Sequence, residues 1–218
     1  MSVFRKMSAL KVIDREEGLV KLRRSKIPQK PLIEIALAGQ IYARDTMEIF
    51  LNALERLNAL SHGDGWKFSL SYYGDYFIGN MFDHNCIVAR GSFEYKELMT
   101  AMGATCSFGV VPYSFDASFS SSAKFSFPSK LVAYIQAGLI PIYVGPGDSS
   151  VFDLFEEYGL TELCITSENS ILIGQQLESI VFNDLSAVRV KLLALSDVFT
   201  PEYLQHCINH VFEQISCK

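Results

Sequence analysis

Short apolar runs alternate with amphipathic stretches along most of the chain. Buried strands are expected where β-branched and aliphatic residues cluster, at 32–38, 66–73, 86–89, 106–111, 140–144 and 162–166. Apolar side chains at helical spacing predict helices at 45–60, 92–102, 128–137, 151–158, 167–182, 185–198 and 201–215. Strands that alternate with helices in this way predict an α/β fold, with a single Rossmann-like, doubly wound parallel sheet and C-terminal helices.

The pattern divides the chain into three parts. Residues 1–31 mix short apolar pairs with basic residues and end in Ile27-Pro28-Gln29-Lys30-Pro31, whose two prolines favour an extended connector. We interpret this part as a basic linker or the remnant of a missing N-terminal domain. Residues 32–199 form the predicted Rossmann-like domain, and residues 200–218 form a predicted C-terminal helix.

Composition excludes some classes of protein. Of the 218 residues, 49% are apolar, which is enough for a large core and excludes global disorder. The net charge of −5 argues against general nucleic-acid binding, although residues 1–31 carry a net +6 and leave −11 for the remainder. That basic segment is either a solvated arm or a patch for peripheral contact with acidic lipid headgroups or a partner.

The expected location is cytoplasmic. Five cysteines without C-x-x-C spacing fit reduced thiols. No apolar run is long enough to be a transmembrane segment, and the N-terminus lacks the apolar region of a signal peptide.

The residues best suited to bind a ligand lie where the helix at 128–137 begins. Ser126 can cap this helix, and Pro128 suits its first turn. Free N–H groups and the positive end of the helix dipole favour an anion there, and Ser129 and Lys130 add a hydroxyl and an ammonium. We therefore expect a phosphate or pyrophosphate at this position.

Further candidates follow from the rule that ligands of such sheets bind at the carboxyl ends of the strands. They are Gly39, Gln40, Arg44, Arg90, Gly91, Ser149 and Ser150. Either arginine can neutralise a second phosphate or form a surface salt bridge instead. The serine-rich stretch 113–124 is expected to be a mobile loop that covers the site.

Other common sites are not predicted. The chain contains neither G-x-G-x-x-G nor a Walker A lysine motif, which argues against a dinucleotide oxidoreductase and a phosphate-loop hydrolase. His206 and His210 have a zinc-chelating spacing with Cys207 between them, but no third ligand is evident, so no metal site is predicted.

The segment Phe127-Pro128-Ser129-Lys130-Leu131, followed by Tyr134 and Ala137–Ile142, resembles a known family. It is similar to the nucleotide-sugar-binding segment in the C-terminal half of retaining GT-B glycosyltransferases of the group 1 type. The resemblance extends more weakly from Pro31 to Leu160, over more than half of the chain. It implies a hexosyltransferase domain that binds a nucleoside diphosphate sugar without a metal cofactor, with the diphosphate at the helix start and Lys130 against it.

The sequence departs from the pattern of that family at functional positions. Many members carry two glutamates separated by seven residues, where this chain has Phe125 and Ala133, and many place Arg and Lys after the first glycine, where this chain has Gln40 and then Arg44. The prediction is therefore a donor-binding domain that needs a separate acceptor-binding domain or chain, with its catalytic residues unassigned. The alternatives are a non-catalytic nucleotide-binding or scaffold module derived from such an enzyme and, third, a nucleotide-sugar epimerase.

Overall fold

The computed structural model describes residues 32–61, 65–75, 78, 81–126 and 129–199. The predicted basic segment 1–31, the predicted helix 201–215 and the histidine pair on that helix lie outside the described residues. Across the described ranges, no helix has the length and apolar character needed to cross a membrane.

The described residues form one six-stranded parallel sheet in the order β3-β2-β1-β4-β5-β6. The strands are β1 (Leu32–Ala38), β2 (Lys67–Tyr73), β3 (Ile87–Gly91), β4 (Phe108–Pro112), β5 (Ile140–Val144) and β6 (Cys164–Ile165). Along the chain, β1, β2 and β3 follow one another from the centre of the sheet to one edge. β4, β5 and β6 then follow one another from the centre to the other edge. This topology confirms the predicted Rossmann-like, doubly wound fold and places its switch point between β1 and β4.

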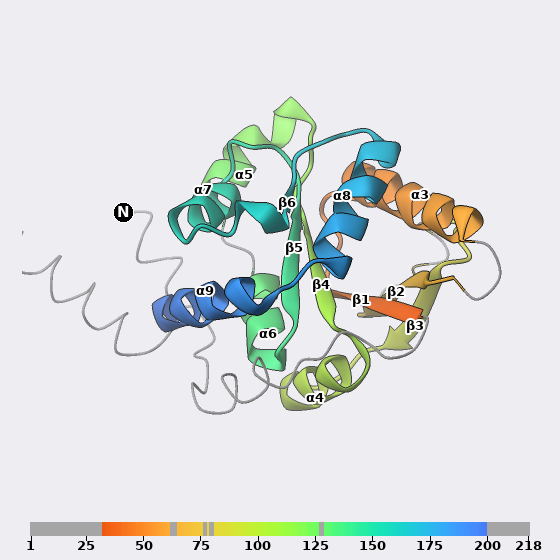
Figure 1. The fold of residues 1–218 in the computed structure, drawn as a ribbon, viewed down its shortest axis with the longest axis horizontal. Coiled ribbons are helices and arrows are strands. Elements are labelled where there is room, and N and C mark those ends of the chain that lie inside the picture. Colours follow the sequence, from red (N-terminus) through yellow and green to blue (C-terminus); the bar gives the residue numbers. More distant parts are fainter. Residues whose placement is uncertain (1–31, 62–64, 76–77, 79–80, 127–128, 200–218) are drawn as a thin grey trace, which may run out of the picture.

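Helices cover both faces of this sheet (Figure 1). On one face α3 (Arg44–Leu60) packs on β2 and against α8 (Ser170–Phe182). On the other face α6 (Ser129–Ala137) packs on β4 and β5, with α4 (Tyr95–Thr105) and α9 (Ser186–Ser196) beside it. The other helical segments are η2 (Ala117–Phe119), α5 (Ser120–Phe125), α7 (Ser150–Glu157), η3 (Thr161–Leu163) and η4 (Asp197–Phe199).

The apolar pattern of the sequence explains this layering. The apolar residues of α3 at helical spacing, Met47, Phe50, Leu51, Leu54 and Leu57, are all buried. β5 is buried along its whole length, as expected for an inner parallel strand with helices on both faces. β3 lies at an edge of the sheet and is more exposed.

Two local predictions were wrong. The helix predicted at 92–102 begins at Tyr95, with Glu94 at its N-cap, and continues to Thr105. The stretch 113–124, predicted to be a loop, instead contains η2 and most of α5. The carboxylate of Asp116 accepts the backbone N–H of Ser118 and so caps η2, a local signal that the serine-rich composition hid.

Candidate functional site

The turn after β1 and the first turn of α6 meet at the switch point. Lys130 Nζ donates a hydrogen bond to the backbone carbonyl of Gln40 (2.7 Å) and lies 5.6 Å from the centroid of the Tyr42 ring. A Cβ added to Gly39 would lie 3.9 Å from the same Nζ. The structure thus brings together Gly39, Gln40 and Lys130, which lie 90 residues apart in sequence.

The surroundings of Lys130 change its charge state. Burial of the side chain lowers the pKa of Lys130 from 10.5 to about 8, because a partly dehydrated ammonium is less stable than one in water. The nitrogen has a carbonyl and an aromatic face beside it, and no carboxylate is paired with it among the described residues. An anion at this position would compensate for the water contacts that the ammonium has lost.

Gly39 gives the turn its shape. Its φ of +72° lies in the left-handed region, which glycine adopts without strain. Its N–H donates to the carbonyl of Tyr73 (2.7 Å), so the ends of β1 and β2 are joined directly beyond their last paired residues. This bond holds the Gln40 carbonyl in place in front of Lys130.

Tyr134 fixes α6 against the two central strands. Its hydroxyl accepts the N–H of Ala38 at the end of β1 (3.1 Å) and donates to the carbonyl of Val110 in β4 (3.1 Å). The side chain is completely buried, and a Cβ on Gly109 would come within 2.5 Å of its ring. Only glycine allows this close approach, which sets the distance between the start of α6 and the end of β1.

A second set of hydrogen bonds fixes the chain that leads into α6. Tyr113 donates through its hydroxyl to the carbonyl of Ser126 (3.0 Å), and the Ser126 hydroxyl donates back to Tyr113 (3.3 Å). Ser150 also donates to the Ser126 carbonyl. The Ser126 hydroxyl thus donates to Tyr113, and its use as a helix cap stays a prediction.

Ser149 has a structural role in this arrangement. It is fully buried, caps α7 by accepting the N–H of Phe152 (3.1 Å), and donates to the Tyr143 hydroxyl (2.7 Å). Ser149 thus begins the helix that the sequence predicts at 151–158. Because the hydroxyls of Ser149 and Ser150 already have partners in the protein, they hold the site in shape, and phosphate contact by either stays a prediction.

The two arginines among the candidate residues have partners elsewhere. Arg44 donates to the carbonyl of Met81 (2.8 Å), and its guanidinium lies 5.8 Å from the Phe82 ring centroid. Arg90 contacts both carboxylate oxygens of Glu34 (2.9 and 3.0 Å).

Arg90 also donates to the hydroxyl of Ser71 (3.2 Å). The next residue, Gly91, has a φ of +85°, and its carbonyl accepts the N–H of Gly74 (3.0 Å). The acidic Glu34 inside an apolar strand was the sequence signal for an internal partner of Arg90. Both guanidinium groups have partners in the protein, and phosphate contact by either stays a prediction.

His84 joins the segment before β3 to α3. Its Nε2 lies 3.1 Å from a carboxylate oxygen of Glu48 and its Nδ1 3.1 Å from one of Glu55, while Glu55 also accepts the N–H of Asn85 (2.8 Å). Burial alone would lower the pKa of His84, but these two carboxylates outweigh it and raise the pKa above 6.5. The hydrogen bonds from His84 and Asn85 outweigh burial at Glu55 and lower its pKa below 4.5.

We predict that His84→Gln lowers the free energy of unfolding by about 1 kcal/mol at pH 6, the scale of a partly exposed ion pair. A raised histidine pKa contributes stability that is complete below pH 6.5, the unfolded value, and is lost as the pH rises through the folded value. Urea unfolding from pH 6 to pH 9 should therefore show the difference between the variant and the wild type shrinking. A difference that stays constant over this range would show that His84 stabilises the fold without its charge.

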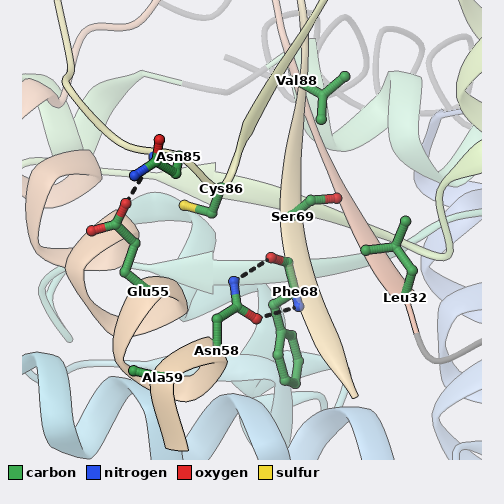
Figure 2. A pocket seen from close by; sticks show the side chains of 9 residues that line it. All are labelled: Leu32, Glu55, Asn58, Ala59, Phe68, Ser69, Asn85, Cys86 and Val88. Atoms are coloured by element: carbon green, nitrogen blue, oxygen red, sulfur yellow. Dashed lines mark hydrogen bonds between the residues drawn. The ribbon is translucent and has the colours of Figure 1, made fainter. Parts of the chain in front are cut away.

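A hollow of about 470 Å³ lies at the other end of the strands (Figure 2). The Asn58 side chain donates to the carbonyl and accepts the N–H of Phe68, and Glu55 accepts from Asn85, so these polar groups hold β2 and the segment before β3 in place. The remaining lining includes Leu32 and Val88. This hollow is separate from the candidate site, because it lies where β1 and β2 begin and the candidate site lies where β1 ends.

The described residues contain no group of three or more His, Cys, Asp and Glu side chains placed to hold a metal ion. The helix dipole and Lys130 are the positive features that the site itself presents to an anion.

Comparison with known proteins finds the same fold in solved structures. No family model and no curated protein matches the chain. Solved structures do match, among them an α,α-trehalose 6-phosphate synthase from Burkholderia multivorans, with a TM-score of 0.58 and 12% identity over 93% of this chain and 48% of that one. An E. coli trehalose-6-phosphate structure bound with UDP-2-fluoro glucose gives 0.60 and 12% over 93% and 50%. The pneumococcal O-GlcNAc transferase GtfA, in complex with UDP and GlcNAc, gives 0.51 and 15% over 85% and 36%.

The chain has the fold of one GT-B half. This GT-B half spans about half the length of the trehalose 6-phosphate synthases that it matches. At 12–15% identity the likeness establishes the fold alone.

The two positions that the resemblance matches to glutamates of many family members lie on either side of the start of α6. Phe125 ends α5 and is 68% exposed, whereas Ala133 is buried in α6. Neither side chain can accept a hydrogen bond, so a ribose or sugar hydroxyl would find no carboxylate from these positions. Sequence reasoning did not include Tyr42 or Tyr113 in the site, although an aromatic residue shortly after each of two central strands was a usable signal.

Proposed function

We propose that this chain is the donor-binding half of a glycosyltransferase. A nucleoside diphosphate sugar binds outside the carboxyl ends of β1 and β4, with its diphosphate against the first turn of α6 and Lys130. The observation that carries this proposal is the meeting of Lys130 with the glycine turn at Gly39 and Gln40, at the switch point of a GT-B half. Solved structures of this fold include complexes with UDP and with a UDP-sugar.

The chemistry of this half is electrostatic. Transfer of the sugar releases a nucleoside diphosphate, and the helix N–H groups and the Lys130 ammonium stabilise the negative charge that develops on it. No metal is required for this step in our proposal, because these groups already face the anion. The acceptor-binding groups come from a second domain or a separate chain, consistent with the half-length match, and the chain alone turns over poorly.

A second candidate function is a non-catalytic nucleotide-binding or scaffold module. It is favoured by Phe125 and Ala133 at the positions where many members of the resembled family carry glutamates, and by the internal partner that holds Arg90. Such a module would keep the fold without transferring a sugar.

Calorimetric titration with UDP, GDP and inorganic pyrophosphate tests the proposal. We expect dissociation constants below millimolar for at least one nucleoside diphosphate. Weaker or undetectable binding of all three up to millimolar concentration would refute the donor site and favour the scaffold. Release of free UDP from a UDP-sugar, measured with and without the proteins that co-purify with the chain, then separates a donor-binding half from a module that only binds.

A further inference from the structure

Tyr42 has an unusual position for a large aromatic side chain. It lies in the short turn between β1 and α3 and is 75% exposed, more than any other large hydrophobic residue among those described. Its hydroxyl donates to the side chain of Gln40, and the Lys130 ammonium lies 5.6 Å from its ring centroid. The ring is therefore held at the site while much of its surface remains available.

This position fits a ligand that carries both an anion and a flat ring. The ammonium of Lys130 touches the Gln40 carbonyl and faces the Tyr42 ring, so a phosphate bound to that ammonium lies beside the ring. In a nucleotide, the base is joined to its phosphates through one ribose. Aromatic side chains stack on the π-face of any base, whereas a sugar offers C–H groups and hydroxyls instead of such a face.

We propose that Tyr42 is the stacking platform for the nucleobase of the ligand whose phosphates bind at Lys130. The inference rests on the proposed nucleotide site and adds to it the residue that recognises the base. Because stacking tolerates every base, Tyr42 favours nucleotides over simple phosphates and discriminates weakly among uracil, guanine and adenine.

The test compares four proteins, wild type and the variants Tyr42→Phe, Tyr42→Leu and Tyr42→Ala, against UDP, ribose 5-phosphate and inorganic pyrophosphate. Tyr42→Phe keeps the ring and loses the bond to Gln40, while Tyr42→Leu keeps an apolar side chain and loses the aromatic face. We expect the dissociation constant of UDP to rise about tenfold in the Leu and Ala variants and less than about threefold in the Phe variant. The constants for pyrophosphate and ribose 5-phosphate should change by less than about twofold in all three.

The outcomes separate the two proposals. Equal losses for UDP and pyrophosphate would show that Tyr42 acts only by holding Gln40 and Lys130, which overturns the stacking role while the anion site remains. Unchanged UDP binding in Tyr42→Ala would also overturn stacking and leave the anion site intact. If wild type binds neither UDP nor pyrophosphate, the nucleotide site itself is refuted, and the stacking role with it.

Discussion

Replacing Tyr134 with alanine is expected to lower the free energy of unfolding by about 4 kcal/mol or more. The ring is completely buried against Gly109, so its removal leaves a cavity between α6 and the sheet. The same change leaves the N–H of Ala38 without its hydroxyl acceptor and the carbonyl of Val110 without its hydroxyl donor. A loss of this size is a large fraction of the roughly 5–15 kcal/mol by which domains are stable.

Urea unfolding followed by far-ultraviolet circular dichroism measures this loss. Tyr134→Phe is the matched control, because it keeps the ring and removes only the hydroxyl, at an expected loss of about 1–3 kcal/mol. Gly109→Ala should also destabilise the fold, since its methyl group would lie 2.5 Å from the Tyr134 ring. A Tyr134→Ala protein as stable as wild type would show that α6 is held to the sheet by other contacts.

The strands could be predicted because each has a local signal. The apolar run of β5 and the alternation in β2 are visible within a few residues, and the glycine and proline residues around them mark their ends. The approach of Tyr134 to Gly109 could not be predicted in this way. It depends on which strand lies under α6, and that neighbour is set by the tertiary packing of distant segments.

The same distinction applies to the candidate site. Gly39, Gln40 and Lys130 come together because carboxyl ends of central parallel strands share one edge, which is a rule of topology. The partners of the arginines follow no such rule. Glu34 lies 56 residues from Arg90, and an exposed cation at a strand end looks the same in sequence whether it binds a phosphate or a carboxylate.

Local capping chemistry accounts for a correct and an incorrect prediction. The sequence places two adjacent serines, Ser149 and Ser150, before the helix predicted at 151–158, which is typical of a helix start, and Ser149 is the one that caps α7. The stretch 113–124 was predicted to be a loop because serine is common in loops, yet it folds into η2 and α5. There the Asp116 cap and the bond from Ser114 to Asp45 of α3 (2.8 Å) outweigh composition.

The charge on Lys130 works against folding. The folded pKa is about 8 and the unfolded value 10.5, so between these pH values the unfolded chain binds more protons. Stability should therefore rise as the pH increases through this range, and below about pH 8 the partly buried ammonium lowers it. This cost falls at the position where the proposed anion would bind, and the anion would offset it.

Lys130→Ala should weaken nucleoside diphosphate binding by about 10- to 150-fold, which corresponds to the roughly 1.5–3 kcal/mol of a hydrogen bond to a charged group. The midpoint of thermal unfolding should stay the same or rise, since the variant no longer buries an ammonium. Calorimetric titration with UDP at pH 7 measures the first effect and scanning calorimetry the second. Lost affinity together with a lowered midpoint would instead indicate that the lysine supports the fold.

The pH dependence of UDP binding tests the role of Lys130 without removing its side chain. Wild-type affinity for UDP should fall as the pH rises through about 8, and binding above that pH should take up a proton, because the anion stabilises the charged lysine. Lys130→Arg keeps its charge to far higher pH, so its affinity should stay nearly constant between pH 7 and 9. Proton uptake is obtained by repeating the titrations in buffers of different ionisation enthalpy. If wild type and Lys130→Arg show the same pH profile, the charge state of Lys130 does not govern binding over this range, and the affinity of Lys130→Ala alone decides whether Lys130 belongs to the anion site.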